Sequence, residues 1–158
     1  MLALLGAHVV LASRKLERVE AAAAEIVAAG GKASAVSVDV RNAELVRSVV
    51  GEVAAAHGRI DLLVNNAAGN FYAPSESLSE NAWKSVIEID LYGTFFCSQA
   101  VLPVMQAQGG GSIVTISCQL TDRRWTLIVH ANAAPCVLDP LPAPRACARA
   151  QHGIRTRH

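Results

Sequence analysis

The sequence predicts an α/β chain whose strands form a doubly wound parallel sheet, and three observations lead to that prediction. Short apolar runs rich in β-branched residues alternate with longer stretches of helical periodicity, as in βαβ units. The short runs do not alternate polar and apolar residues, as expected of strands covered on both faces. Polar or small residues follow each run, and such sheets bind ligands at the carboxyl ends of their strands.

Four strands are predicted, each short and mostly apolar. They span residues 8–12, 34–38, 61–64 and 112–116. Because right-handed crossovers connect parallel strands, the residues that follow these four runs should meet at one edge of the sheet. We therefore expect a single site built from those residues rather than four unrelated loops.

Three helical patterns separate the strands. Apolar residues recur at helical spacing in 16–27, before the glycine pair Gly30-Gly31, and in 45–53, before Gly58. The third pattern runs from about 79 to 108, with Ser79 as its N-cap and three consecutive glycines at its end. One apolar stripe is predicted along it, formed by Trp83, Val86, Ile87, Leu91 and Phe95.

Length and composition are those of one globular domain. Of the 158 residues, 52% are hydrophobic and 17% are charged, which allows a sizeable core. The net charge of +1 gives no electrostatic footprint for nucleic acid or an anionic membrane. No apolar run approaches a membrane span of roughly 20 residues, and no secretory signal pattern opens the chain. A cytoplasmic protein is predicted, with a peroxisomal location left open.

The four cysteines predict neither a metal site nor a redox dithiol. They form no C-x-x-C pair and no cluster with histidine at the spacing of zinc ligands. Reduced thiols are the expected state.

Residues 135–158 predict an irregular tail rich in Pro, Ala and Arg. The segment 135–150 holds four of the six prolines, and proline cannot donate to a helix or sheet ladder. The predicted domain therefore spans residues 1–134. Such a composition also arises when GC-rich codons are read out of frame, a hypothesis that the coding DNA would settle.

Three motifs resemble the short-chain dehydrogenase/reductase family in their order and spacing. They are Asp39-Val40 after the second strand, Asn65–Gly69 (NNAAG) after the third, and 111–117 (GSIVTIS) around the fourth. The resemblance covers about residues 1–134. It implies a Rossmann-like sheet that lacks the family's first strand and Gly-rich pyrophosphate loop.

Within this family, three segments look most like 2,4-dienoyl-CoA reductases of the peroxisomal type and their bacterial relatives. The segments are 65–71 (NNAAGNF), 87–95 (IEIDLYGTF) and 129–131 (VHA). The resemblance implies an NADP-dependent oxidoreductase with an acyl-CoA substrate and homo-oligomeric intact relatives. The net charge of +1 and the lack of a span-length apolar run predict no nucleic acid or membrane partner.

The NNAAG turn is implied to lie against the dinucleotide. Asn66, Ala67, Ala68 and Gly69 would let the adenosine ribose approach, and Asn65 would tie neighbouring strands together. The alternative is a tight strand-to-helix turn whose amides cap free backbone groups. Two further cofactor-binding positions are predicted at the end of the last strand, namely Ile116 and Ser117.

Ser13, Arg14 and Lys15 follow the first predicted strand, at the position where the family distinguishes NADP(H) from NAD(H). A guanidinium can grip the 2′-phosphate with two hydrogen bonds, so NADPH is preferred over NADH. The alternative is two solvated cations, although positive charge at a helix start is unfavourable for the helix dipole.

Asp39 and Val40 resemble the family pair beside the adenine. There the carboxylate accepts from the exocyclic amine, and the aliphatic chain packs on the ring. Asp39 could instead cap the helix that begins after Asn42, and both interpretations stay open.

The family's four catalytic positions all differ in this chain. The usual asparagine, serine, tyrosine and lysine are replaced by Asp90, Cys118, Ala131 and Pro135. The resemblance to dienoyl-CoA reductases implies that Asp90 is the catalytic residue and positions a water as proton donor. The alternative is a structural carboxylate satisfied by backbone donors. Cys118 is expected to line the pocket, since no partner base is evident.

The predicted parent activity is NADPH-dependent reduction of a 2,4-dienoyl-CoA in fatty acid degradation. The missing first strand and Pro135 predict a truncated, C-terminally altered chain with weak dinucleotide binding and little activity. A second interpretation is a reductase of 3-oxoacyl thioesters or carbonyls, against which the missing tyrosine at Ala131 argues. A third is a non-catalytic fragment that pairs with an intact relative.

Overall fold

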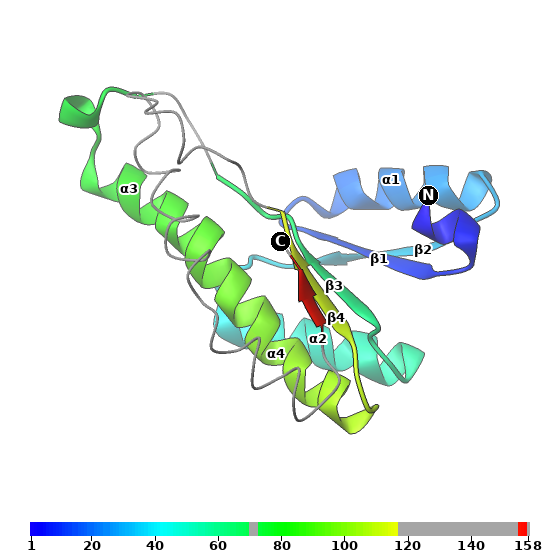
Figure 1. Cartoon of the computed structure of the whole chain (residues 1–158). Coiled ribbons are helices and arrows are strands. Elements are labelled where there is room, and N and C mark those ends of the chain that lie inside the picture. The colour runs from blue at the N-terminus through cyan, green and yellow to red at the C-terminus, as the bar shows by residue number, and fades with distance from the viewer. Residues whose placement is uncertain (70–72, 117–154, 158) are drawn as a thin grey trace. The chain divides into compact units, whose positions relative to one another are not determined.

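The computed structural model describes residues 1–69, 73–116 and 155–157, and the chain divides into two compact units. The first unit is Met1–Asp39 and the second is Val40–His158. In both, parallel strands are connected by helices (Figure 1). The predicted α/β class is therefore confirmed, with the described strands arranged in two sheets, one in each unit.

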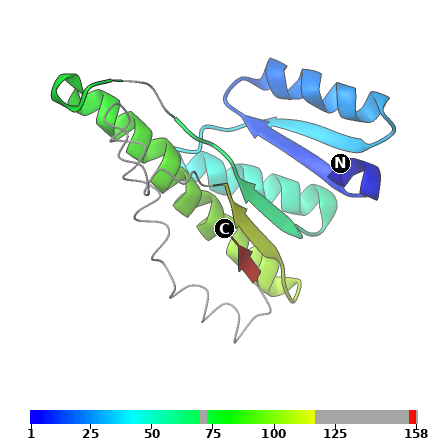
Figure 2. The same ribbon diagram turned by 45° about the horizontal axis from the view of Figure 1, so that its top comes forward.

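The first unit is a single βαβ motif preceded by one turn of 3₁₀ helix. Its elements are η1 (Leu2–Leu5), β1 (His8–Ser13), α1 (Leu16–Ala28) and β2 (Lys32–Ser37). The strands are parallel, with His8 opposite Lys32 and Ser13 opposite Ser37, and α1 packs along them (Figure 2). The turn after α1 uses Gly30 at a φ of +85°, which explains the predicted glycine stop.

The second unit has a three-stranded parallel sheet. Its elements are α2 (Ala43–His57), β3 (Leu62–Asn65), η2 (Ser75–Ser77), α3 (Glu80–Ile87), η3 (Glu88–Tyr92), α4 (Gly93–Ala107), β4 (Ser112–Thr115) and β5 (Arg155–Arg157). The strand order is β3-β4-β5, with Leu62 opposite Ser112 and Asn65 opposite Thr115. No helix in the described ranges is long and apolar enough to cross a membrane.

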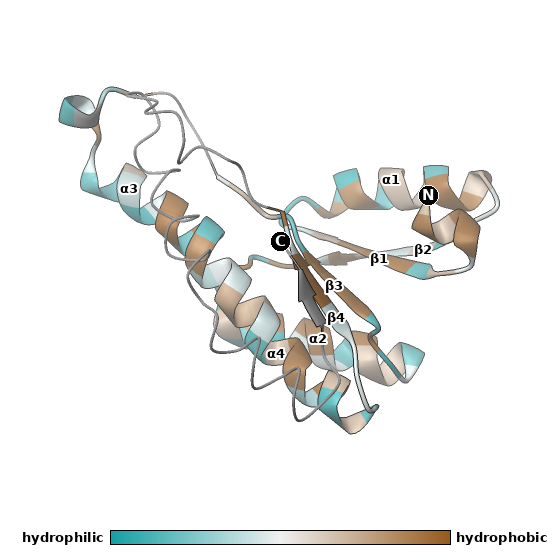
Figure 3. Cartoon of the chain, viewed as in Figure 1, coloured by the Kyte–Doolittle hydropathy of each residue, from teal (hydrophilic) through white to brown (hydrophobic). Residues whose placement is uncertain are grey.

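The core of the second unit lies where α2 and α4 meet the sheet. Val101 and Met105 of α4 are almost fully buried and pack with Ile113 of β4. Partly buried apolar side chains surround them, namely Val50, Ile60, Leu63 and Leu102. The strands that contribute to this core are coloured mostly hydrophobic in Figure 3, as predicted for strands packed against helices.

The four predicted strands are confirmed within two residues of their predicted ends. The largest shift is in β2, which begins at Lys32. The sequence offered no signal for β5, which lies within the predicted irregular tail. The predicted domain boundary at residue 134 falls outside the described residues.

The third predicted helix is interrupted by a π-helical turn, η3. Ser79 caps α3 as predicted, with its Oγ accepting from the Ala82 N–H at 3.2 Å. The predicted apolar stripe is wrong in part, because Val86 is buried whereas Phe95 is 55% exposed and Trp83 39% exposed. A π turn closes i→i+5 hydrogen bonds and adds a residue, so it rotates every later side chain about the helix axis.

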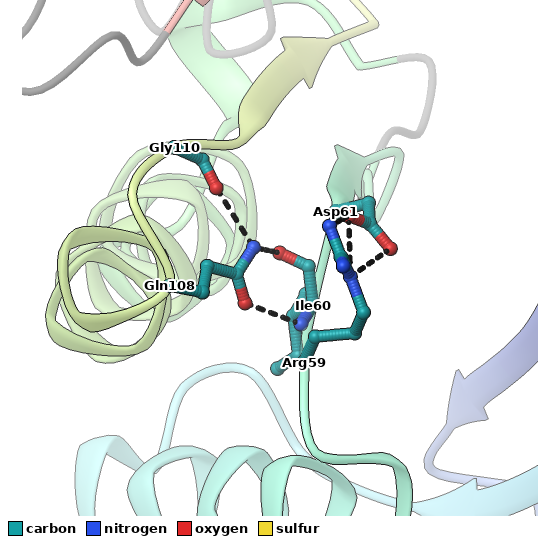
Figure 4. A network of polar contacts seen from close by, with 5 residues as sticks. All are labelled: Arg59, Ile60, Asp61, Gln108 and Gly110. Atoms are coloured by element: carbon teal, nitrogen blue, oxygen red, sulfur yellow. Dashed lines mark hydrogen bonds and ion pairs between the residues drawn. The ribbon is translucent and has the colours of Figure 1, made fainter.

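A glutamine joins the end of α4 to the start of β3 (Figure 4). Gln108 Nε2 donates to the Ile60 and Gly110 carbonyls, both at 2.7 Å, and its Oε1 accepts from the Ile60 N–H at 2.9 Å. The side chain thus gives Ile60 the two hydrogen bonds of a neighbouring strand. Beside it Arg59 pairs with Asp61 at 2.6 Å, but both are exposed, so this ion pair contributes little to stability.

Candidate functional site

The strand-end turn, residues Asn66–Gly69, follows β3 directly. Asn66, Ala67 and Ala68 are exposed, and their short side chains leave the backbone accessible. Because β3 and β4 are parallel, Ile116 lies just past the end of β4 at the same edge of the sheet, and it is 59% exposed. Of the predicted residues in the second unit, Asn66–Gly69 and Ile116 therefore lie at the carboxyl edge of its sheet.

Asp90 of η3 holds the far end of this turn. Its Oδ1 accepts from the Gly69 N–H at 2.7 Å, a short hydrogen bond of the charge-assisted kind. The packing there is close, since a Cβ on Gly69 would lie 3.0 Å from Ile89 Cδ1. The contact supports the interpretation that backbone donors satisfy this carboxylate. The contact is compatible with a catalytic role, because a carboxylate can accept several hydrogen bonds.

Asn65 holds the near end of the turn. Its side chain is 8% exposed, and Nδ2 donates to Ser98 Oγ at 3.1 Å. The expectation that this amide ties neighbouring strands is corrected: the Asn65 carbonyl does so by accepting from the Ile116 N–H at 2.9 Å, whereas the side chain binds α4. A one-dimensional motif does not show which group of a residue makes which contact.

Two hydroxyls missed by the sequence analysis continue this arrangement. Ser98 Oγ donates to the Thr94 carbonyl at 2.7 Å, and Thr94 Oγ1 donates to the Asp90 carbonyl at 2.8 Å. Asp90, Thr94 and Ser98 are spaced four residues apart and form one polar face, named here the polar helix face. That spacing is the signal that could have identified them.

Val40 packs against the first residue of α4. A Cβ on Gly93 would lie 2.7 Å from Val40 Cγ2, so the two are in close contact. The N-cap of α2 is Asn42, whose Oδ1 accepts from the Glu44 and Leu45 N–H groups at 3.1 Å. Capping of this helix is thus explained by Asn42 rather than Asp39.

The remaining predicted residues lie in the first unit. Ser13 ends β1, Arg14 and Lys15 follow it, and Asp39 follows the parallel strand β2, so all four lie at one edge of that sheet. Ser13 Oγ accepts from the Lys15 N–H at 3.3 Å, and both cationic side chains are exposed. No side-chain hydrogen bond caps the start of α1. This helix start presents two cations and uncapped backbone donors.

Several predicted positions fall outside the described residues, namely Ser117, Cys118, Ala131 and Pro135. Cys97 is the cysteine within the described ranges, and burial raises the pKa of its thiol, which keeps it protonated and unreactive at neutral pH. The described ranges contain no group of three His, Cys, Asp or Glu side chains that could hold a metal ion.

An open hollow of about 440 Å³ lies at the amino ends of β3 and β4. Its lining consists of Arg59, Asp61, Gln108, Gly109, Gly110, Gly111 and Ser112. It is thus at the opposite end of the strands from Asn66–Gly69 and is not the predicted site.

Comparison with known proteins agrees with the family resemblance that the motifs indicated. The family model described as short chain dehydrogenase matches residues 1–156. A peroxisomal 2,4-dienoyl-CoA reductase from Danio rerio is 40% identical over 151 residues, covering 95% of this chain and 50% of the relative. A probable 2,4-dienoyl-CoA reductase from Bacillus subtilis (strain 168) is 47% identical over 96 residues, covering 61% of this chain and 38% of the relative.

A solved structure agrees in fold. A metagenomic short-chain oxidoreductase, crystallised with NADP, superposes with a TM-score of 0.90 and 32% identity, covering 98% of this chain and 71% of that one. The chain spans about half the length of the curated relatives it matches. Since several relatives are named peroxisomal, the expected cytoplasmic location stays a prediction.

Proposed function

The chain belongs to the short-chain dehydrogenase family, and we propose on that premise that it carries a site for NADPH-dependent reduction of a 2,4-dienoyl-CoA. Similarity to dienoyl-CoA reductases supports the substrate class. The observation that carries the proposal is the hydrogen bond between Asp90 and Gly69, which puts the predicted catalytic carboxylate directly beside the predicted cofactor turn.

Each unit, taken by itself, presents groups that fit one part of a dinucleotide. Asn66, Ala67 and Ala68 are small and exposed, so a flat group can reach the backbone of the turn. Arg14 and Lys15 are exposed beside the uncapped start of α1, where cations and backbone donors suit a phosphate. We assign the turn to the ribose and the two cations to the 2′-phosphate.

We assign Asp90 to the protonation step of the reaction. NADPH, when bound, would supply one hydride to the conjugated diene, which with one proton leaves a single double bond. With Oδ1 engaged by Gly69, the carboxylate is held at a fixed orientation at the end of the turn. We propose that it also positions a water as proton donor, since Ala131 occupies the place of the family's usual tyrosine.

Arg14→Ala is expected to weaken NADPH binding about tenfold and to leave NADH binding unchanged, because only NADPH carries the 2′-phosphate. Fluorescence titration of the purified chain with each cofactor measures this. Arg18→Ala is the matched control, since Arg18 is also exposed but lies within α1. Equal losses for the two cofactors, or for the two variants, would contradict the assignment; failure of the unaltered chain to bind either cofactor would contradict the proposed function.

Pro135→Lys is expected to strengthen NADPH binding about tenfold, because it restores the family's charge-assisted donor. Dienoyl-CoA-dependent oxidation of NADPH should then be measurable by absorbance. Adding Asp90→Asn should return the rate to background without loss of NADPH binding, because an amide oxygen still accepts from Gly69. Pro144→Lys is the control for charge alone. Activity in the double variant Pro135→Lys/Asp90→Asn would show that Asp90 is not a catalytic residue.

A further inference from the structure

The strand-end turn is anchored at both ends by one helical segment. Asn65 is bound by Ser98 of α4, and Gly69 is bound by Asp90 of η3. Asn66, Ala67 and Ala68 lie between these anchors with exposed side chains. The turn is thus fixed at its ends and open in the middle.

We propose that Ser98 is a positioning residue for the cofactor turn, acting through Asn65. Its hydroxyl proton is directed to the Thr94 carbonyl at 2.7 Å, so the oxygen presents lone pairs to Asn65 Nδ2 at 3.1 Å. A hydroxyl has one proton, so Ser98 can only accept from Asn65. The arrangement therefore selects one of the two orientations of the Asn65 amide.

Burial makes this selection effective. The Asn65 side chain is 8% exposed, and a buried amide left without a partner is costly. The Asn65 carbonyl accepts from the Ile116 N–H at 2.9 Å, so a shift of Asn65 would also disturb the end of β4. Fixing Asn65 therefore preorganises the backbone that follows it, which reduces the entropy lost when a ligand binds there.

Ser98→Ala is expected to weaken NADPH binding about fivefold, the usual effect of one lost hydrogen bond. Ser98→Thr keeps the hydroxyl and should restore the affinity. Ser48→Ala is the matched control, because Ser48 is a helical serine whose Oγ donates to Glu52 at 3.0 Å on the exposed face of α2. The expected change in NADPH affinity rests on the proposed function.

Amide hydrogen exchange without cofactor tests the inference independently of that function. In Ser98→Ala, the two hydrogen-bonded amides beside the turn, Gly69 and Ile116, should exchange about fivefold faster, with the remainder of the second unit unchanged. If the unaltered chain fails to bind NADPH, the proposed function fails, while this exchange pattern still decides the role of Ser98. Unchanged exchange at Gly69 and Ile116, or a uniform rise throughout the second unit in Ser98→Ala alone, would overturn the inference.

Discussion

Gly93→Ala is expected to lower the free energy of unfolding by about 3 kcal/mol, because α4 begins where Val40 leaves no room for a side chain. An added Cβ would lie 2.7 Å from Val40 Cγ2 and 3.0 Å from Val40 Cβ. Gly93 has helical dihedrals, with φ of −57° and ψ of −47°, so alanine suits the backbone and only the contact is unfavourable. Valine branches at Cβ and has few rotamers, so it cannot turn away.

Gly51→Ala is the matched control for this change. Gly51 also lies in a helix, α2, but a Cβ there would meet nothing within 4 Å. Alanine should therefore stabilise that position by up to about 1 kcal/mol through helix propensity. Urea unfolding followed by circular dichroism measures both variants. Similar stabilities for the two would show that Val40 accommodates the new methyl group.

Local chemistry explains most of the elements that the sequence predicted. Ser79 and the glycines Gly30 and Gly58 mark helix ends because a cap or a left-handed turn depends on residues close in sequence. The strands were predictable because their apolar runs are short and bounded. Strand β5 could not be predicted in this way. It is only three residues long, and its strand conformation depends on pairing with β4, which is distant in sequence.

The π turn was not predictable from periodicity. A 3.6-residue period assumes that each turn adds the same rotation, and η3 breaks that assumption between Glu88 and Tyr92. The predicted stripe therefore held at Val86 and failed at Phe95. The rotation at η3 explains the exposure of Phe95 but not that of Trp83, which precedes this turn.

The residues of the candidate site were predictable from the sequence, but the hydrogen bonds between them were not. Asp90 was identifiable because a carboxylate is unusual on an apolar stripe. Its bond to Gly69, 21 residues away, depends on how the crossover returns to the sheet. Ser98 resembles any other helical serine until Asn65 is placed opposite it. Such long-range pairs are set by tertiary packing, to which a motif search has no access.

Gln108→Ala is expected to cost about 2 kcal/mol of unfolding free energy, since it removes three hydrogen bonds, two of them to the backbone of Ile60. Gln99→Ala, at an exposed position within α4, should change stability by less than about 0.5 kcal/mol. Gln108 is the C-cap residue of α4, so helix propensity enters only the Gln99 substitution, where the difference between Gln and Ala is small. Their difference in urea unfolding therefore measures the Gln108 contacts, and equal stabilities would show that water replaces them.

Gln108→Glu separates the donors from the acceptor at this position. Glutamate can still accept from the Ile60 N–H, but at pH 7 its second oxygen faces the Ile60 and Gly110 carbonyls, which accept from Nε2 in the unaltered chain. The folded state should therefore favour the protonated acid and raise the pKa of this carboxyl above the ordinary value of about 4.3. The stability deficit relative to the unaltered chain should shrink as the pH falls through that raised pKa, because the acid regains a donor. A deficit independent of pH between 7 and 4 would mean that the carbonyls of Ile60 and Gly110 do not need the glutamine as their donor.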